Sequence, residues 1–217
     1  MKIAVFGTGN VGDTIASKLV SLGHEVMMGS RTADNIKAQA FVEKHQGLAS
    51  AGTFADAAAF AEIIFNCTAG MGSIEALTMA GAGNMNGKII IDLANALDFS
   101  NGMPPSLGFA NTTSLGEEIQ RAFPETKVVK TLNTMWCGLM VNPAMIHNAE
   151  HQVFVSGNDA EAKEIVKDIL KSFGWKDEYI LDLGDIKTAR GTEMYLPIWL
   201  SIYGATNNGA FNIKIVS

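Results

Sequence analysis

Hydrophobic positions along the chain follow two periods, and these periods predict its secondary structure. Apolar runs of strand length recur, as at 3–6 and 63–65. Between such runs, apolar residues return every three or four positions and mark one face of a helix, as do Ile15, Ala16, Leu19 and Val20. Strands that alternate with helices are typical of a mostly parallel sheet. The pattern therefore predicts an α/β fold.

The same periods place the individual elements. Strands are expected at 3–6, 24–28, 62–67, 88–92, 127–132, 152–156 and 179–183. Helices are expected before Leu22 and at 34–45, 54–60, 73–80, 114–123, 159–173 and 187–203, with Ser114 and Glu117 as a capping box. Pro104 and Pro105, among several Asn and Gly residues, predict a long loop at 95–113. We expect one domain at 1–150 and a small C-terminal α/β extension at 151–217.

A glycine-rich motif lies between the first predicted strand and the first predicted helix. It reads Gly7, Thr8, Gly9, Asn10, Val11 and Gly12. In a strand-turn-helix unit, such glycines allow the tight turn, the approach of a pyrophosphate and close helix packing. The phosphates then lie on free N–H groups at the helix N-terminus. The motif predicts a doubly wound, Rossmann-type fold that binds a dinucleotide; the alternative is a turn that binds nothing.

The end of the second predicted strand indicates which dinucleotide is bound. Ser30 and Arg31 stand where an NAD enzyme usually has a carboxylate for the ribose 2′-hydroxyl. A hydroxyl and a guanidinium instead suit a 2′-phosphate. Thr8 and Lys37 are further candidate phosphate ligands. We therefore expect NADP(H), the alternative being that Arg31 is a solvated loop residue.

Residues after other strands are candidate ligands as well, because a parallel sheet binds at the carboxyl ends of its strands. Thr68 and Ala69 are expected near the adenosine and pyrophosphate, and the amides of Asn95 and Asn133 near the nicotinamide. Each Asn could equally close an Asx turn. Met135 and Trp136 are candidate walls of an acceptor site, although a Trp after a strand more often serves packing.

General acids are not evident near any predicted strand end, so no catalytic residue is assigned. His147 and His151 have no evident partner, and we expect no metal site. Asp182, Asp185, Arg190 and Glu193 are expected to form a structural ion-pair network. The pattern favours a site in which the cofactors carry the chemistry and the protein supplies geometry.

Composition narrows the class of partner. The formal net charge of −6 argues against nucleic acid or an anionic membrane. The chain shows no apolar stretch of spanning length and no signal peptide, so the cytoplasm is the expected location. Cys67 and Cys137 form no metal-binding spacing and are expected to be reduced thiols.

Several motifs resemble the NADPH-dependent reductases of the deazaflavin coenzyme F420. They are the glycine motif, Gly23-His24-Glu25, Gly29-Ser30-Arg31, Lys130-Thr131-Leu132-Asn133-Thr134, the stretch from Phe154 to Asp159 and the tail from Asn208 to Lys214. The chain is also similar to the cytosolic domains of six-span ferric reductases.

The resemblance implies a homodimer and direct hydride transfer between NADP and a deazaflavin or flavin. It also implies that 151–217 completes the acceptor site and contributes to the dimer interface. Phosphate contacts carry over to Thr8, Ser30 and Arg31. A basic residue of the family is Asn35 here, and Lys37 is its candidate replacement.

We therefore expect an NADPH-dependent oxidoreductase with a small planar redox acceptor. Two alternatives stay open: an NADPH-binding regulatory or sensor protein without turnover, and a reductase of small carbonyls or imines.

Overall fold

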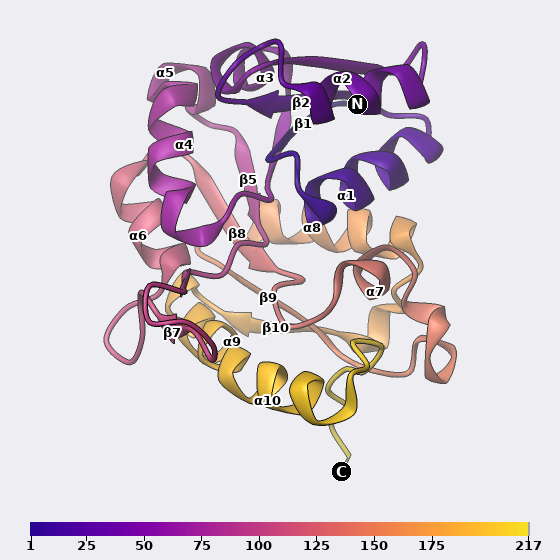
Figure 1. The fold of residues 1–217 in the computed structure, drawn as a ribbon, viewed down its shortest axis with the longest axis vertical. Helices are drawn as coiled ribbons and strands as arrows, with labels where there is room; N and C mark the ends of the chain where they lie inside the picture. The colour runs from indigo at the N-terminus through magenta and orange to yellow at the C-terminus, as the bar shows by residue number, and fades with distance from the viewer. Residues whose placement is uncertain (217) are drawn as a thin grey trace.

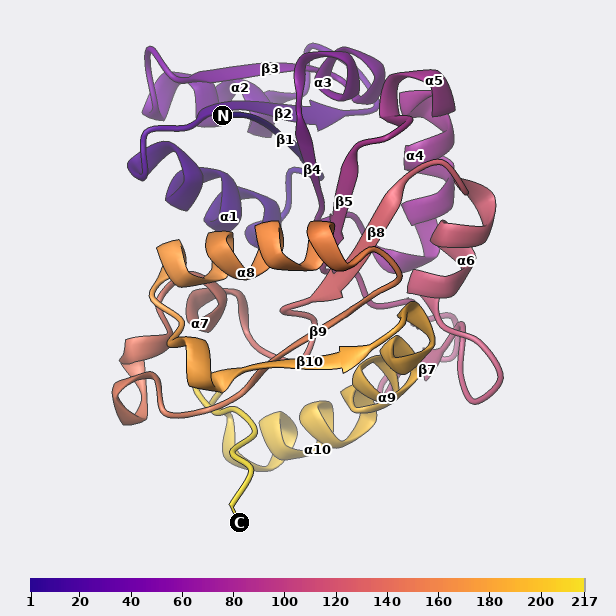
Figure 2. The ribbon, with the colours of Figure 1, turned by 180° about the vertical axis from the view of Figure 1, so that it is seen from behind.

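Within residues 1–216, which the computed structural model describes, eight strands form one sheet in the order β10-β9-β8-β5-β4-β1-β2-β3 (Figure 2). Every pair is parallel except β8 with β9. The strands are β1 (Lys2–Phe6), β2 (Glu25–Ser30), β3 (Ala49–Thr53), β4 (Ile63–Asn66), β5 (Ile89–Asp92), β8 (Lys127–Thr131), β9 (Val153–Gly157) and β10 (Ile180–Gly184). The predicted doubly wound, mostly parallel sheet is confirmed.

Helices cover both faces of this sheet (Figure 1). One face packs against α1 (Asn10–Ser21), α2 (Ile36–Lys44), α7 (Cys137–Val141) and α8 (Ala160–Phe173). The other packs against α3 (Phe54–Phe60), α4 (Ser73–Ala80), α5 (Ala82–Met85), α6 (Leu115–Ala122) and α9 (Ala189–Met194). Helix α10 (Leu196–Thr206) lies at the opposite end of the molecule from β2.

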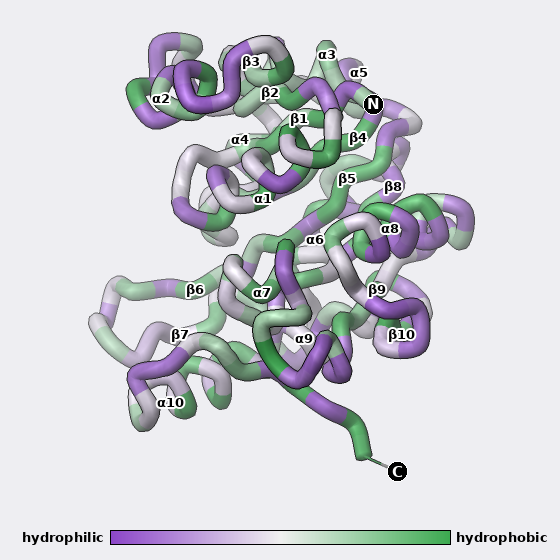
Figure 3. The backbone as a smooth tube through the Cα atoms, turned by 90° about the vertical axis from the view of Figure 1, so that its right-hand side faces the viewer, coloured by the Kyte–Doolittle hydropathy of each residue, from purple (hydrophilic) through white to green (hydrophobic). Residues whose placement is uncertain are grey.

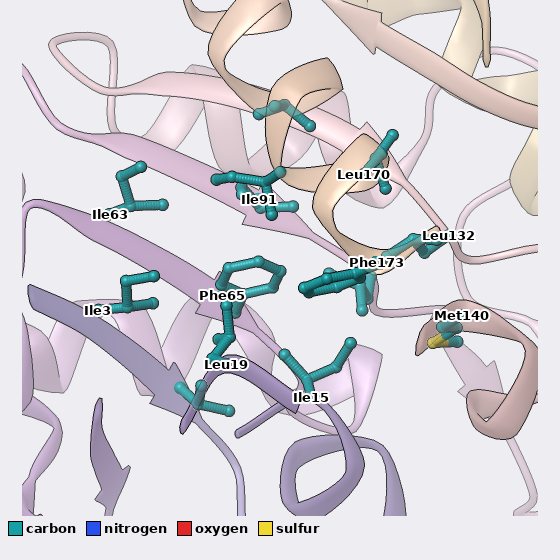
Figure 4. Packing of buried hydrophobic residues seen from close by; sticks show 14 of the residues in the cluster. Ile3, Ile15, Leu19, Ile63, Phe65, Ile91, Leu132, Met140, Leu170 and Phe173 are labelled. Atoms are coloured by element: carbon teal, nitrogen blue, oxygen red, sulfur yellow. The ribbon is translucent and has the colours of Figure 1, made fainter. Parts of the chain in front are cut away.

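The two cores follow from the alternation of side chains along each buried strand. In β1, Ile3 and Val5 join the first core, whereas Ala4 and Phe6 join the second. In the first core Phe65 stacks on Phe173 of α8, with ring centroids 6.4 Å apart (Figure 4). Figure 3 shows the hydrophobic character of β1 and β4, which is expected for strands buried on both faces.

The C-terminal residues extend the same sheet. β9 and β10 continue it beyond β8, and α8 packs into the first core. The tail after α10 returns to the start of β9, where the Gln152 N–H donates to the Ile213 carbonyl at 2.9 Å. Residues 151–216 thus add strands to the main sheet, and the division of 151–217 from 1–150 as a separate domain stays a prediction.

Several predicted elements are corrected. The helix expected at 187–203 is divided into a 3-10 turn (Ile186–Thr188), α9 and α10. Pro197 in the first turn of α10 explains the break, since a proline inside a continuous helix removes a hydrogen bond and clashes with the preceding turn. Strand β3, of sequence ASAGT, was not expected, nor was the short pair β6 (Leu97–Asp98) and β7 (Ser106–Leu107) within the loop.

The N-terminus of α6 also differs from a reciprocal capping box. Ser114 caps it as expected, accepting from the Glu117 N–H at 3.2 Å. The Glu117 carboxylate, however, accepts from the Ser114 hydroxyl at 2.9 Å and binds Arg190. The first N–H groups of α6 bond instead to Glu193 of α9.

Candidate functional site

The glycine motif occupies the crevice between β1 and β4, where the strand order reverses. Gly7 has φ +106°, and a Cβ there would lie 2.6 Å from the Cys67 carbonyl oxygen. A Cβ on Gly12 would lie 2.0 Å from the Gly7 carbonyl oxygen. Around Gly9, in contrast, no heavy atom of residues 1–216 outside Gly9 and its immediate surroundings in the chain lies within 4 Å of a built Cβ. The fold requires glycine at 7 and 12, whereas at 9 it leaves open space.

That open space lies in front of the N-terminus of α1. Gly9 is its N-cap residue and supplies no side-chain hydrogen bond to the first turn. Asn10 and Val11 begin the helix. Because the first N–H groups of a helix lack intrahelical acceptors, this end can accept an anion.

A first cavity of about 470 Å³ opens beside the motif. Arg31 is exposed at its edge and forms no ion pair within residues 1–216. Ser30 is buried, and its hydroxyl donates to the Thr32 carbonyl at 2.5 Å. The lining residues are Gly7, Thr8, Gly9, Ser30, Arg31, Asn35, Phe54, Cys67, Thr68, Ala69, Gly72 and Ala76. Phe54, Gly72 and Ala76 were missed because only the tertiary fold brings α3 and α4 here.

Lys37 lies outside this cavity. It lines a neighbouring hollow with Asn10, Asp13 and Lys44, and the two hollows share Thr8 and Gly9. Asn35 lines the first cavity, but its side-chain oxygen caps α2 by accepting from the N–H groups of Lys37 and Ala38. Lys37 as a replacement phosphate ligand stays a prediction.

A second cavity of about 170 Å³ adjoins the first through Cys67 and Thr68, which line both. Asn95 and Asn133 meet here from the ends of β5 and β8. The Asn95 amide donates to the Asn133 carbonyl at 2.8 Å, and the Asn133 amide donates to Asn95 Oδ1 at 3.0 Å. The remaining lining residues are Val11, Leu93, Ala94, Met135, Met140, Leu196 and Trp199.

The lining of the second cavity contains no carboxylate, imidazole, amine, guanidinium or phenol among the described residues. Its one readily titratable group is the Cys67 thiol. Burial raises the pKa of this thiol, and the nearby Asp92 and Cys137 raise it further. The thiol therefore stays protonated at neutral pH, and no side chain of this cavity is an evident general acid.

Close to these strand ends lies a buried charged cluster. Lys130 of β8 contacts the carboxylates of Asp92 at 2.9 Å and Glu193 at 2.8 Å, and all three side chains are at most 4% exposed. Burial alone would lower the pKa of Lys130, but the two carboxylates raise it overall. Glu193 also accepts from the Leu115 and Gly116 N–H groups. The cluster ties α9 to the strand ends.

The four residues expected to form one ion-pair network near the C-terminus do not do so. Three of them form ion pairs with three different partners. Glu193 binds Lys130, Arg190 binds Glu117, and Asp182 binds Lys163. Asp185 instead caps the 3-10 turn that follows it. The four residues are close in sequence, but β10, the 3-10 turn and α9 direct their side chains toward different neighbours.

Hydrogen bonds connect the cavities to this cluster. The Thr68 hydroxyl donates to Asn66 Oδ1 at 2.7 Å, and the Asn66 amide donates to Asp92 Oδ1 at 2.8 Å. Ser73, fully buried at the start of α4, bonds to both Thr68 and Asn66. Thr68 is thus held in a fixed orientation where the two cavities meet.

The aromatic residues are arranged differently from the prediction. Met135 lines the second cavity as expected, but Trp136 is 42% exposed and is absent from the lining. Trp199 lines the cavity instead. It stacks on Tyr203 and Phe211, with centroids 5.5 and 5.3 Å apart. Trp199 was missed because an aromatic residue in an apolar helix is typical of ordinary packing.

His151 has partners that the sequence did not reveal. Its Nε2 lies 2.9 Å from the Pro143 carbonyl, and its Nδ1 lies 2.7 Å from the Asn212 amide. The histidine thus connects the tail to the segment around Pro143, and it lies outside both cavities.

Across residues 1–216, no group of three or more His, Cys, Asp or Glu side chains is placed to hold a metal. No helix among these residues is long and apolar enough to cross a membrane.

Comparisons with known proteins agree with this geometry. The family model described as NADP oxidoreductase coenzyme F420-dependent matches residues 2–96. A crystal structure of a proposed F420-dependent NADP-reductase from Arthrobacter sp. FB24 is 53% identical, with a TM-score of 0.95 and full coverage of both chains.

More distant matches share less of the sequence. Metalloreductase STEAP3 of Rattus norvegicus is 27% identical over 91% of this chain, which spans 38% of that protein's length. An imine reductase from Aspergillus terreus, solved with NADPH4, is 20% identical, with a TM-score of 0.66 over 95% of this chain and 62% of its own. At that identity the likeness concerns the fold alone.

Proposed function

The chain belongs to the NADP oxidoreductase coenzyme F420-dependent family and is an NADP-dependent oxidoreductase, and we propose that its acceptor is a deazaflavin, a flavin or a similar planar redox molecule. The observation that carries the proposal is the second cavity, which adjoins the dinucleotide crevice and lacks an evident general acid among the described residues. Such a cavity suits an acceptor whose own ring takes up both hydride and proton.

The first cavity fits the phosphates of NADP(H). The open space at Gly9 would admit the pyrophosphate to the N-terminus of α1, between Thr8 and Val11. Arg31 would pair with the 2′-phosphate as a bidentate cation, and Thr8 would add a hydroxyl. Ser30 would join them once its hydroxyl turns from the Thr32 carbonyl to the phosphate. Thr68 and Ala69 would contact the adenosine and pyrophosphate.

The second cavity fits the nicotinamide and part of the acceptor. When bound, NADPH supplies the hydride. The paired amides of Asn95 and Asn133 hold the ends of β5 and β8 together and present polar atoms to the nicotinamide end. Leu93, Met135 and Leu196 would exclude water. The protein's contribution is then orientation of two flat rings, which alone can lower a barrier substantially.

A panel of acceptors tests this proposal. Under anaerobic conditions, NADPH oxidation should be fast with 5-deazariboflavin or riboflavin and slow with cyclic imines and small ketones, which need a proton donor. Faster reduction of an imine or ketone would favour the carbonyl or imine reductase alternative. Oxidation of no acceptor, with tight NADPH binding, would favour the sensor alternative.

We also propose that the protein is a cytoplasmic homodimer that associates through α10. This helix is strongly apolar, yet Leu196 is its one buried residue, while Ile198 and Tyr203 are 52% and 43% exposed. Exposed apolar patches mark interfaces. The parent should sediment as a dimer and Ile198→Glu as a monomer; a monomeric parent would contradict the proposal.

The cytoplasmic location is supported by the cysteines. Cys67 and Cys137 are free thiols, which are compatible with a reducing compartment.

A further inference from the structure

The ammonium group of Lys130 reaches beyond its two carboxylates to the wall of the second cavity. A lysine ammonium has three hydrogens to donate and accepts none. Asp92 and Glu193 accept two of them, at 2.9 and 2.8 Å. The carbonyl oxygen of Ala94 accepts the third. Ala94 lines the second cavity, so the buried cluster is in direct contact with the backbone of that cavity.

Ala94 is held on both sides of its Cα atom. Its N–H donates to Asp92 Oδ1 at 3.1 Å, while its carbonyl accepts from Lys130. Because Asp92 and Lys130 also bind each other, one ion pair fixes both polar groups of this residue. Leu93 and Asn95, on either side of Ala94, line the cavity as well. The ion pair therefore holds the whole segment from Leu93 to Asn95.

Stability alone does not account for this cluster. Its three side chains are at most 4% exposed, and two carboxylates share one ammonium. The N–H groups of Leu115 and Gly116 satisfy part of the excess negative charge. Replacing a whole buried ion cluster by apolar residues often leaves a fold equally stable, although removing one member is costly. What such a cluster can add is a fixed geometry, and here that geometry belongs to a cavity wall.

The neighbouring strand end is also held in a determined conformation. Leu132, two residues beyond Lys130 on the chain, is buried and has φ +61°. A residue other than glycine adopts this conformation at a cost in free energy, and keeps it only where its surroundings require it. The next residue is Asn133, which pairs with Asn95 across the cavity wall. Strained backbone of this kind is typical of functional sites.

We propose that Lys130 and Asp92 are positioning residues for the nicotinamide, because they fix the segment from Leu93 to Asn95 against which the nicotinamide packs. This inference rests on the proposed function, which places the nicotinamide in the second cavity. Neither charged side chain is part of the cavity lining, so both act through the backbone of Ala94. A supporting group that keeps a wall in place preserves the geometry of the site without touching the ligand.

Lys130→Met tests the inference, since it removes the ammonium and keeps a side chain of similar length. Isothermal titration compares NADP⁺ with 2′-phospho-ADP-ribose, which has every part of NADP⁺ except the nicotinamide base. The Kd of NADP⁺ should rise about five- to tenfold in the variant, because the nicotinamide loses its fixed wall. The Kd of 2′-phospho-ADP-ribose should change less than twofold. Both proteins are titrated below their unfolding transitions.

Asp92→Asn is the second variant and keeps the inference testable if Lys130→Met does not fold. It leaves one buried ammonium with one buried carboxylate, so the charges of the cluster balance. Whichever way the new amide turns, its NH₂ group faces either Lys130 or the Ala94 N–H, and one contact to Ala94 is lost. The variant should show the same selective rise in the Kd of NADP⁺.

Met85→Ala is the matched control. Met85 is fully buried and precedes the start of β5, at the opposite end of the strand from the second cavity. The substitution destabilises the fold by leaving a hole in its core, and it should alter neither Kd.

Other results overturn the inference. An unchanged Kd of NADP⁺ in either folded variant refutes it and leaves the proposed function intact. An equal loss for both ligands, or the same selective loss in Met85→Ala, would mean that the cluster acts on the fold as a whole. A parent that binds NADP⁺ no more tightly than 2′-phospho-ADP-ribose would refute both the inference and the placement of the nicotinamide. The titrations use no acceptor, so failure of the acceptor panel contradicts the proposed function alone.

Discussion

At the scale of single residues, the three glycines of the motif differ in what requires them. Gly7 and Gly12 are required by the backbone atoms next to them, whereas Gly9 faces open space. The sequence pattern treats the three alike. The structure separates a requirement of the fold from a candidate requirement of the ligand.

Gly9→Val should abolish NADPH binding and leave the unfolding midpoint nearly unchanged, because the side chain would occupy the space predicted for the pyrophosphate. Gly83→Val is the matched control, since Gly83 also has open space around it and lines neither cavity. Fluorescence titration with NADPH and thermal unfolding measure both effects. Normal binding by Gly9→Val would remove the motif from the site.

Arg31→Ala should weaken NADPH binding by about 1.5–3 kcal/mol and leave NADH binding nearly unchanged, as expected for loss of a charge-assisted phosphate contact. The exposed guanidinium forms no ion pair within residues 1–216, so its loss should not unfold the protein. Competitive titrations of both nucleotides measure this. Equal affinities of the parent for NADPH and NADH would contradict the assignment of the 2′-phosphate.

At the scale of elements, the cluster of Lys130, Asp92 and Glu193 connects β8, β5 and α9. Lys130→Met leaves two buried carboxylates without their cation, which should lower the free energy of unfolding by about 3–5 kcal/mol. Lys127→Met on the same strand removes a half-exposed ion pair with Asp159 and should cost at most about 1 kcal/mol. Urea unfolding compares the two variants, and similar losses would mean that the cluster adds no special stability.

The tail after α10 is a second connecting element, which is held by His151. Its contribution to the free energy of unfolding should depend on pH. Burial lowers the pKa of His151 below 6.5, the Pro143 carbonyl partly opposes this, and His147 and Lys214 lower it further. The unfolded chain then binds more protons between the two pKa values, so stability is complete above about pH 6.5 and falls at lower pH.

His151→Gln should therefore flatten the decrease in the free energy of unfolding below about pH 6.5. Burial also lowers the pKa values of His24 and His45, so the variant should retain part of the slope. Unfolding measured at several pH values gives the slopes of parent and variant. Identical slopes would show that protonation of His151 does not affect the folded tail.

Elements with a strong period were predictable, and those formed by tertiary contacts were not. The strand at 88–92 and the helix at 159–173 have clear apolar patterns and were found nearly to the residue. Strand β3 has only small residues and one Thr, so its pairing with β2 decides its conformation. At the site, Gly7, Thr8 and Gly9 line the first cavity and belong to one motif that is visible in the sequence, whereas Trp199 lines the second cavity only because α10 folds back over it.

At the scale of the whole molecule, one sheet brings the two cavities together. Its strand order reverses at β1, which places the first cavity beside the glycine motif, and the second adjoins it through Cys67 and Thr68. The C-terminal helices complete the second cavity with Leu196 and Trp199. Cofactor and acceptor would thus be held against each other by one continuous surface.

The most direct test of this account follows a deuterium atom. NADPH stereospecifically deuterated at C4 would be mixed anaerobically with the protein and 5-deazariboflavin, separately for each C4 face, and the product analysed by mass spectrometry. Because C5 of a deazaflavin forms a stable carbon–hydrogen bond, the transferred atom is retained. The account predicts one deuterium at C5 with NADPH labelled on one C4 face and none with the other. Reduced product without deuterium from either label, or no reduction at all, would contradict it.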